Sequence, residues 1–247
     1  MGCIAALSSS NQNYYRGNLL LDSLATYPFF FVPSAGTWIV VYADTNHNPS
    51  LVLNVYENEG IFENKPTKNT WFKEIPVGEL IIKSDSSFAI RWRNHNKFRV
   101  VNSDELYSEF HNKNLVLSRN YVGKPFNSKA SSAYHIWQSR TKFVGGITDV
   151  DLLRLDESGK PVEIIEIKRS RINPNSWKPY YQDKGGYEIL ENLCKKLSLN
   201  FSIIYYHFDP HMRIEDIQRL TLFRKKEGFS FVKVGSLSLD EFIHKKY

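Results

Sequence analysis

The sequence contains little cysteine and no long apolar run. Its 247 residues include only two cysteines, Cys3 and Cys194, which lie far apart along the chain. Neither a disulfide framework nor a cysteine-based zinc cluster is therefore indicated, and a reducing, cytoplasmic (intracellular) setting is expected. The longest apolar run near the start, residues 27–32, is far too short to span a bilayer, so no membrane partner is expected.

Motifs of several common enzyme classes are also missing. The chain has no Gly-rich phosphate-binding loop and no Gly-x-Ser-x-Gly elbow, so ATP use is not expected. His207 and His211 are four residues apart, but the Asp-Pro pair between them breaks any helix, which argues against a zinc site. With 42% hydrophobic and 14% aromatic residues, the composition suits a folded chain of one large or two modest domains.

Acidic residues are absent from the whole stretch between Glu109 and Asp149. The net charge of +6 is uneven as well: residues 1–110 hold 9 Lys or Arg against 11 Asp or Glu, and residues 111–247 hold 23 against 15. A basic stretch without acidic residues suits binding of a polyanion such as nucleic acid, because its cations neutralise backbone phosphates. The alternative is a positively charged surface that is simply solvated. The cations of the acid-free stretch are Lys113, Arg119, Lys124, Lys129, Arg140 and Lys142.

Directly after this stretch, the sequence predicts a β-hairpin. Its arms, residues 145–155 and 161–168, are rich in Val, Ile and Leu, and residues 156–161 form a turn-forming cluster between them. If the chain reverses between Ser158 and Gly159, opposed residues have numbers that add up to 317. The register of the hairpin can therefore be predicted.

This register brings four charged side chains onto one face of the hairpin. Asp151 is expected opposite Glu166, and Asp149 opposite Lys168, because directly opposed residues share a face. The apolar residues that alternate with them, such as Leu152, are expected on the other face, and both faces are predicted to be buried. Three carboxylates in such surroundings need more positive charge than one lysine provides, and a divalent cation would supply it.

The ligand chemistry of this cluster favours a hard metal ion. Its candidate ligands are carboxylate oxygens without a nearby Cys or His, which suits Mg²⁺, with Mn²⁺ as a substitute, rather than zinc. Such an ion polarises a phosphoryl oxygen and lowers the pKa of a bound water, while Lys168 orients or helps to deprotonate that water. The predicted reaction is phosphodiester hydrolysis.

These residues resemble the PD-(D/E)XK nuclease superfamily, in which an Asp near a strand end and a Glu-x-Lys on the neighbouring strand bind the metal. The matching residues are Glu166-Ile167-Lys168 and either Asp149 or Asp151. Asp151 is favoured because the predicted register sets it opposite Glu166. The proline that precedes the Asp in the family pattern is absent before both aspartates. The resemblance also implies the main-chain carbonyl of Ile167 as a metal ligand.

The resemblance covers residues 103–208 and implies an α/β (mixed α+β) fold with a restriction-endonuclease-like α-β-β-β-α-β core and a mixed sheet. Two domains are expected: a β-rich N-terminal region of residues 1–101, with a role in nucleic-acid recognition, and a nuclease domain of residues 102–247. The core elements expected are a helix capped by Asn102 and Glu105, a strand at 133–139, the hairpin, a helix at 180–197 and a strand at 201–208.

The remainder of the chain gives weaker signals. Residues 214–223 fit either a helix or a strand, residues 229–234 a strand, and residues 238–246 a short capped helix; these elements are expected to extend the core sheet. Residues 91–99 interleave cations with aromatic side chains, which suits either stacking on bases or an ordinary exposed strand.

The resemblance adds Gln182 and Tyr187 at the start of the predicted helix, where some members of the superfamily place a Gln and a Tyr to steady the lysine and touch the phosphate; a core position for Tyr187 is the alternative. Lys178 and Lys184 are alternative phosphate contacts. The residues predicted to bind nucleic acid are Arg91, Arg93, Lys124, Lys129, Arg140, Lys142, Arg169, Arg171, Lys178 and Tyr187.

Taken together, the sequence predicts a Mg²⁺-dependent endonuclease that acts on DNA rather than RNA. The alternative is a catalytically inactive nucleic-acid-binding protein that retains the nuclease fold. A homodimer is compatible with this function, because double-strand cutting by an enzyme with one site usually requires two copies.

Overall fold

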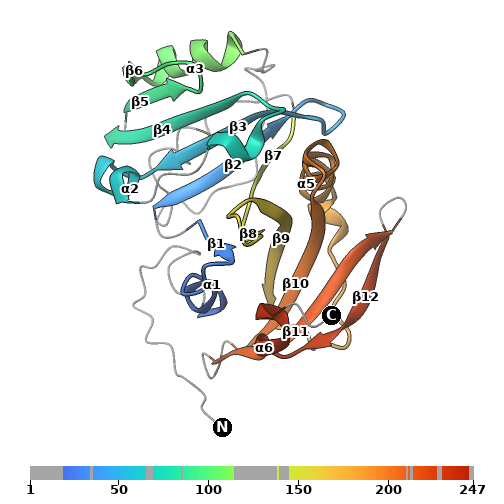
Figure 1. Cartoon of the computed structure of the whole chain (residues 1–247). Coiled ribbons are helices and arrows are strands. Elements are labelled where there is room, and N and C mark those ends of the chain that lie inside the picture. Colours follow the sequence, from blue (N-terminus) through green and yellow to red (C-terminus); the bar gives the residue numbers. More distant parts are fainter. Residues whose placement is uncertain are drawn as a thin grey trace. The chain divides into compact units, whose positions relative to one another are not determined.

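The structure of the chain is a computed structural model that describes residues 19–33, 36–64, 69–84, 86–113, 138, 145–209, 211, 214–226 and 230–244. These residues form two compact units, whose elements are labelled in Figure 1. The first unit takes its described residues from Met1–Val32, Asp151–Lys184 and Ser198–Tyr247, and the second from Pro33–Val150 and Gly185–Leu197. Each unit is therefore assembled from separate stretches of the chain.

A six-stranded mixed sheet forms the centre of the first unit. In spatial order its strands are β1 (Phe30–Phe31), β8 (Leu152–Leu155), β9 (Pro161–Ser170), β10 (Asn200–Asp209), β11 (Ile214–Lys226) and β12 (Ser230–Leu237). Strands β9 and β10 pair in parallel, and the other neighbours pair antiparallel. A parallel pair needs a crossover connection, and the chain between β9 and β10 contains η2 (Tyr181–Asp183) and α5 (Lys184–Leu197).

The sheet of the first unit is buried on both faces at β8 and β9, as predicted. Leu152, Ile165 and Ile167 belong to one apolar cluster, which is closed by residues of α1 (Leu19–Leu24) and α6 (Leu239–Ile243). Ile164, which points to the opposite face by strand alternation, is also fully buried. Burial of each such side chain contributes about 1.5–3 kcal/mol, so β9 is a central element of the fold.

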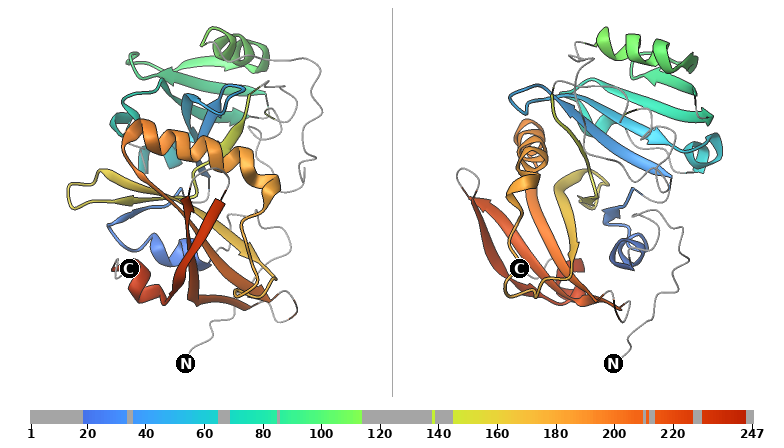
Figure 2. Two further views of the ribbon diagram at one scale, coloured as in Figure 1. Left: turned by 90° about the vertical axis from the view of Figure 1, so that its right-hand side faces the viewer. Right: turned by 180° about the vertical axis from the view of Figure 1, so that it is seen from behind.

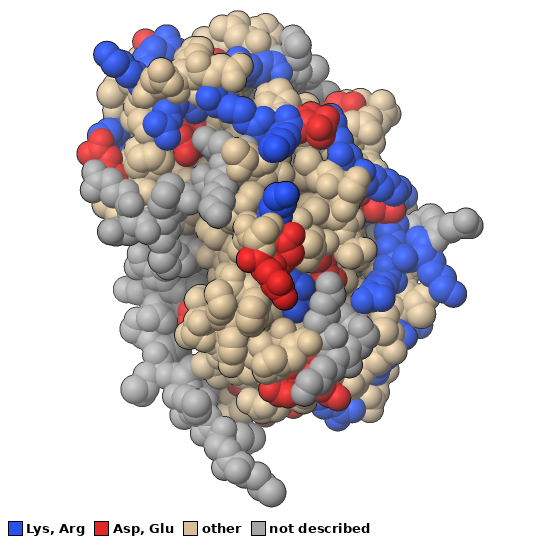
Figure 3. Space-filling view, in the orientation of Figure 1, with Lys and Arg blue, Asp and Glu red and all other residues tan. Residues whose placement is uncertain are grey.

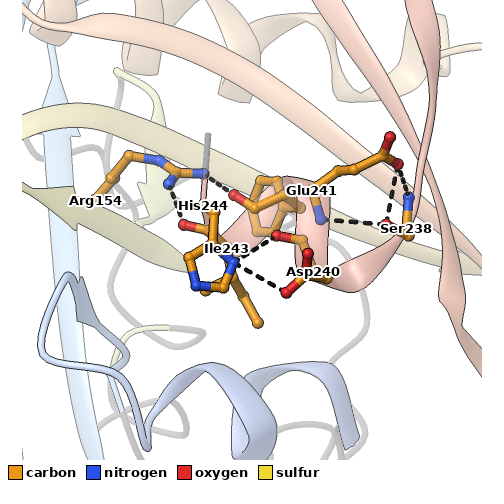
Figure 4. Close-up of polar contacts among 7 residues, drawn as sticks. Arg154, Ser238, Asp240, Glu241, Ile243 and His244 are labelled. Atoms are coloured by element: carbon orange, nitrogen blue, oxygen red, sulfur yellow. Dashed lines mark hydrogen bonds and ion pairs between the residues drawn. The ribbon is translucent and has the colours of Figure 1, made fainter. Parts of the chain in front are cut away.

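A buried arginine connects this sheet to the last helix of the described chain (Figure 4). The Arg154 guanidinium donates hydrogen bonds to the carbonyl oxygens of Phe242 (2.8 Å) and Ile243 (3.3 Å) at the end of α6. It also pairs with the Glu163 carboxylate at 3.2 Å, and the Ser202 hydroxyl donates to the same carboxylate at 2.6 Å. The end of α6 is thereby held by the Arg154 guanidinium, whose positive charge is balanced by the Glu163 carboxylate.

The second unit also contains a six-stranded mixed sheet. In spatial order its strands are β6 (Arg99–Asn102), β5 (Ser87–Trp92), β4 (Val77–Ser84), β3 (Pro49–Tyr56), β2 (Thr37–Ala43) and β7 (Ile147–Asp149). Strands β3 and β4 are parallel, and the other neighbours are antiparallel. The helices described in this unit include α2 (Glu59–Asn64), η1 (Asn69–Phe72), α3 (Ser103–His111) and the part of α5 from Gly185 onward.

The capping box predicted for the helix after residue 102 is confirmed. The Asn102 side chain accepts hydrogen bonds from the backbone of Asp104 and Glu105, and the Glu105 carboxylate accepts one from the Asn102 backbone. The helix packs on β5 and β6, where Glu109 accepts a hydrogen bond from Trp92 Nε1 at 2.7 Å. Helix α3 therefore belongs to the second unit and does not open the sheet that contains β8 and β9.

The helix predicted at 180–197 is confirmed as η2 followed by α5. Its apolar stripe is buried at Ile189, Leu190 and Leu193, as expected for an amphipathic helix. Close packing fixes its position in the second unit: a Cβ at Gly146 would come within 2.4 Å of Ile189 Cδ1. Among the described residues, no helix is both long and apolar enough to cross a membrane.

The C-terminal part of the chain extends the sheet of the first unit, as predicted, and its ambiguous segment is a strand. Strand β11 is antiparallel to β10 and to β12, which lies at the edge of the sheet (Figure 2). Helix α6 begins with a second capping box, formed by Ser238 and Glu241. Local capping and pairing with β10 together determine these elements.

The predicted domain boundary needs correction. The chain does not divide at residue 101, because residues 19–32 join the sheet of the first unit through β1, whereas β7 at residues 147–149 joins the sheet of the second. The strand predicted at 133–139 lies outside the described residues, apart from Gln138. The mixed α+β class is confirmed, with two mixed sheets.

Candidate active site

The register predicted for the hairpin is confirmed in β8 and β9. Leu152 pairs with Ile165, and paired residue numbers add up to 317 as far as Arg154. Asp151 lies directly before β8, and its Oδ2 accepts a hydrogen bond from the backbone N–H of Ile167 at 2.8 Å. The Asp151 carboxylate therefore sits at the point where the backbone ladder between the two strands ends.

Asp149 does not pair with Lys168 as predicted. It lies in β7 and pairs with Val40 of β2, in the second unit. The first arm of the predicted hairpin is thus divided between two sheets, because the pairing with β2 takes up residues 147–149 before β8 begins. Of the two candidate aspartates, Asp151 is the one in the same unit as Glu166 and Lys168.

The Lys168 ammonium lies between two carboxylates. Its Nζ is 2.9 Å from Glu166 Oε1 and 3.0 Å from Asp183 Oδ2. Glu166 and Lys168 are two residues apart on β9 and therefore project from the same face of the strand, whereas Asp183 is the last residue of η2. Two charge-assisted contacts hold the lysine in one place, an arrangement that a flexible surface lysine lacks.

The Glu166 carboxylate is buried, and its two oxygens have different surroundings. Oε1 contacts Lys168, whereas Oε2 is buried without a hydrogen-bond partner. Burial raises the pKa of the Glu166 carboxyl above its ordinary value, the Lys168 ammonium and a contact with Asp151 oppose the rise, and the charge of Asp183 adds to it. An unsatisfied buried carboxylate oxygen is costly in a protein, so this atom marks a position for a cation or donor.

The candidate ligands fit a magnesium ion better than an ion that needs a complete protein cage. Among the described residues, no group of three or more His, Cys, Asp and Glu side chains is arranged to hold a metal. Mg²⁺ is usually bound through one or two carboxylates and keeps waters or substrate phosphate oxygens as its other ligands. Asp151 and Glu166 interact with each other, and Glu166 Oε2 has no hydrogen-bond partner, so these two carboxylates could hold such an ion.

The residues predicted at the start of the following helix fall into different environments. Gln182 is exposed in η2, next to Asp183. Tyr187 is buried in α5, with 1% of its surface exposed, so the predicted contact with nucleic acid is wrong and the core position is correct.

Arg169 was predicted to bind nucleic acid, but the structure gives it a structural partner. Its guanidinium forms an ion pair with the buried carboxylate of Glu215 and lies 5.0 Å from the centroid of the Phe208 ring. Glu215 also accepts hydrogen bonds from the Leu19 backbone (2.9 Å) and the Tyr206 hydroxyl (3.3 Å). Arg169 thus compensates a buried charge inside the first unit.

Arg91 and Arg93 in the second unit also have partners within the protein. Arg91 Nε donates to the Glu79 carboxylate at 2.7 Å, and its guanidinium lies 4.5 Å from the Phe98 ring centroid. Arg93 donates to the carbonyl oxygen of Phe72 at 2.8 Å, and burial lowers its pKa. Both arginines therefore have partners within the second unit.

Two exposed cations of the second unit also have acidic neighbours. Lys83 pairs with Glu59, and Arg99 pairs with Glu109. Figure 3 shows Lys and Arg side chains next to Asp and Glu over the strands of this unit.

Other predicted nucleic-acid contacts stay open. Arg171 and Lys178 are exposed in the segment between β9 and η2. The remaining predicted contacts lie outside the described residues; these are Lys124, Lys129, Arg140 and Lys142.

No family model matches the chain, and neither a curated protein nor a solved structure matches it.

Sequence reasoning missed two residues that shape the candidate site. Asp183 was not selected, although an acid next to Gln182 and shortly before a helix is a candidate partner for a lysine on the preceding strand. Trp177 stacks on Tyr205 with ring centroids 4.5 Å apart and anchors the segment before η2. No local pattern marks that contact, because Tyr205 lies 28 residues further along the chain.

Proposed function

We propose that this protein is a Mg²⁺-dependent endonuclease with a PD-(D/E)XK-like active site formed by Asp151, Glu166 and Lys168, and that DNA is its preferred substrate. The observation that carries the proposal is that the two carboxylate oxygens of Glu166 have different surroundings. Oε1 contacts the Lys168 ammonium, whereas Oε2 is buried without a hydrogen-bond partner, and the Asp151 carboxylate is nearby. An unsatisfied buried carboxylate oxygen is costly, and a metal ion bound between Asp151 and Glu166 would satisfy it.

Asp151 and Glu166 would hold the metal, with the main-chain carbonyl of Ile167 as a further ligand. A bound Mg²⁺, or Mn²⁺ in its place, would neutralise negative charge on the phosphate and lower the pKa of a water. The Ile167 N–H fixes Asp151 by a 2.8 Å hydrogen bond, so this ligand is held before any metal arrives. Pre-positioning of this kind reduces the cost of assembling the site.

Hydrolysis requires a water oxygen to form a bond to phosphorus while the bond from phosphorus to the leaving oxygen breaks. The water loses a proton and the leaving oxygen gains one. Lys168 can donate hydrogen bonds to the attacking water or to a phosphoryl oxygen whose negative charge grows during the reaction. Asp183 is a positioning residue, because its contact with Lys168 Nζ helps to keep the ammonium beside Glu166.

A cleavage assay with matched variants tests the proposal. Supercoiled plasmid and labelled DNA and RNA oligonucleotides are incubated with the protein in Mg²⁺, in Mn²⁺ and in excess chelator. We expect cleavage with either metal, none in chelator, and a loss of about 10²–10⁴-fold for Lys168→Ala or Glu166→Gln. Lys195→Ala is the control, since Lys195 also pairs with a glutamate (Glu191, 2.9 Å) but on the exposed surface of α5.

The outcomes separate the proposal from its alternative. Equal cleavage by Lys168→Ala, Glu166→Gln and the unaltered protein would remove these residues from the active site. Binding of DNA without cleavage in either metal would favour the inactive nucleic-acid-binding protein. A calorimetric titration with Mn²⁺ gives an independent readout, because Glu166→Gln should abolish metal binding whether or not a suitable substrate has been found.

A further inference from the structure

The segment between β9 and α5 carries a concentration of exposed apolar side chains. Ile172, Tyr180 and Tyr181 are 41%, 37% and 69% exposed. They account for three of the seven large hydrophobic side chains exposed among the described residues, although the segment is short. Isolated exposed apolar residues need no explanation, but a group of them beside a candidate active site points to a binding surface.

This segment is firmly attached to the sheet of the first unit. Trp177 is buried and stacks on Tyr205, with an interplanar angle of 11°, while its ring meets Phe223 edge-on at 5.2 Å. The Tyr205 hydroxyl donates to the Ser170 carbonyl at 3.1 Å, and the Trp177 backbone N–H donates to the Asn173 carbonyl at 3.0 Å. The exposed side chains are thus presented from an ordered support, which lowers the entropy cost of binding.

The two tyrosines differ in how they are held. The Tyr180 hydroxyl is 3.2 Å from Ser170 Oγ, and its ring packs edge-on against Trp177 at 5.7 Å, so Tyr180 is part of the support. Tyr181 has the most exposed ring of the group, and the Lys184 ammonium lies 5.7 Å from its centroid. Tyr181 therefore presents an exposed aromatic ring with a cation over one of its faces.

The position of Tyr181 links this surface to the candidate active site. It lies two residues before Asp183, which contacts Lys168. Ser170, whose hydroxyl contacts Tyr180, lies two residues after Lys168 on β9. Tyr181 and Lys168 are thus connected through Asp183 and Tyr180, which places Tyr181 in the segment that a nucleic-acid strand bound at Lys168 would meet.

We propose that Tyr181 is a stacking site for an unpaired base of the substrate, with Lys184 contacting the adjoining phosphate. The inference rests on the proposed nuclease function and narrows its substrate class to nucleic acids with an unpaired nucleotide near the cleaved bond, such as flaps, bulges and single strands. Aromatic rings bind bases through their faces, and those faces are covered by stacked neighbours inside a duplex. Exposed Arg171 and Lys178 in the same segment add the positive charge that such a strand requires.

Binding measured without metal tests this proposal independently of cleavage. A DNA with 2-aminopurine at an unpaired position is titrated with the protein in chelator, and quenching of the fluorescent base reports stacking. Tyr181→Ala should weaken binding roughly 5- to 150-fold, the factor that corresponds to about 1–3 kcal/mol for one stacked base, and should abolish the quenching. Tyr181→Phe should retain both. Phe29→Ala is the control, since Phe29 is another exposed aromatic residue of this unit, 40% exposed.

A fully paired duplex provides the second arm of the test. Tyr181→Ala should bind it as the unaltered protein does, because no base face is available. Equal effects of Tyr181→Ala on paired and unpaired DNA, or none on either, would overturn the stacking site even if Lys168-dependent cleavage is observed. Quenching that depends on Tyr181 without any cleavage would retain the stacking site and refute the nuclease. A change from dimer to monomer in Tyr181→Ala, measured by light scattering, would assign the residue to a contact between copies instead.

Discussion

Arg154 offers the sharpest test of how the first unit is held together. The side chains of Arg154 and Glu163 are only 4% and 3% exposed, and the arginine also donates to the carbonyl oxygens of Phe242 and Ile243 (Figure 4). Arg154→Met keeps most of the aliphatic volume but removes the charge and every donor. Glu163 would then keep its charge in a buried site, with Ser202 as the partner that remains.

The expected loss in the free energy of unfolding depends on which groups lose their partners in Arg154→Met. Removing one member of a buried ion pair costs about 3–5 kcal/mol, chiefly because the other charge is left uncompensated. The two carbonyl groups at the end of α6 lose donors as well, at about 1 kcal/mol each, although these losses are not additive with the first. We expect Arg154→Met to lower the free energy of unfolding by about 3–5 kcal/mol, a large part of the roughly 5–15 kcal/mol typical of a folded protein.

Urea unfolding followed by circular dichroism measures this loss, and a double-mutant cycle identifies its origin. Adding Glu163→Gln to Arg154→Met should restore part of the stability, because it removes the uncompensated charge. Arg99→Met is the matched control: Arg99 also pairs with a glutamate, but its side chain is 58% exposed, and such pairs contribute about 0–1 kcal/mol. A loss for Arg154→Met as small as that for Arg99→Met, or a double variant no more stable than Arg154→Met, would refute the reasoning.

Two further predictions concern packing and pH. A Cβ at Gly145 would lie 1.7 Å from the carbonyl oxygen of Ala43, so Gly145→Ala should displace the backbone. We expect the free energy of unfolding, measured in urea, to fall by about 1–3 kcal/mol or more. Gly235→Ala is the control and should have little effect, because the space around its Cβ is open. Burial raises the pKa of Tyr205 to about 12, above its ordinary value near 10. The contribution of the Tyr205 hydroxyl to the free energy of unfolding is therefore complete below pH 10, and it is lost as the pH rises toward 12 because the unfolded chain loses the proton first. The stability advantage of the unaltered protein over Tyr205→Phe should therefore shrink across that interval in thermal melts; a constant difference would contradict the assignment.

The sequence alone was sufficient for features that depend on residues close together in the chain. The turn of the β8–β9 hairpin is one example: Asp156 Oδ1 accepts hydrogen bonds from the backbones of Ser158 and Lys160, and Gly159 adopts a positive φ of 74°. Because these contacts span at most four residues, the turn chemistry determines the register, and with it the approach of Asp151 to the strand that carries Glu166. The two capping boxes are local for the same reason.

Tertiary structure alone decided which distant partner each charged residue acquires. Asp149 has the spacing of a hairpin residue but pairs with Val40, since β2 offers a strand edge that residues 147–149 complete. Arg169 resembles a phosphate ligand in sequence but compensates Glu215, 46 residues away. Asp183 contacts Lys168 although no sequence period links them. Alternation and turn chemistry specify the face and register of a strand, whereas the choice among distant partners depends on which backbone edges and buried charges the complete fold leaves to be satisfied.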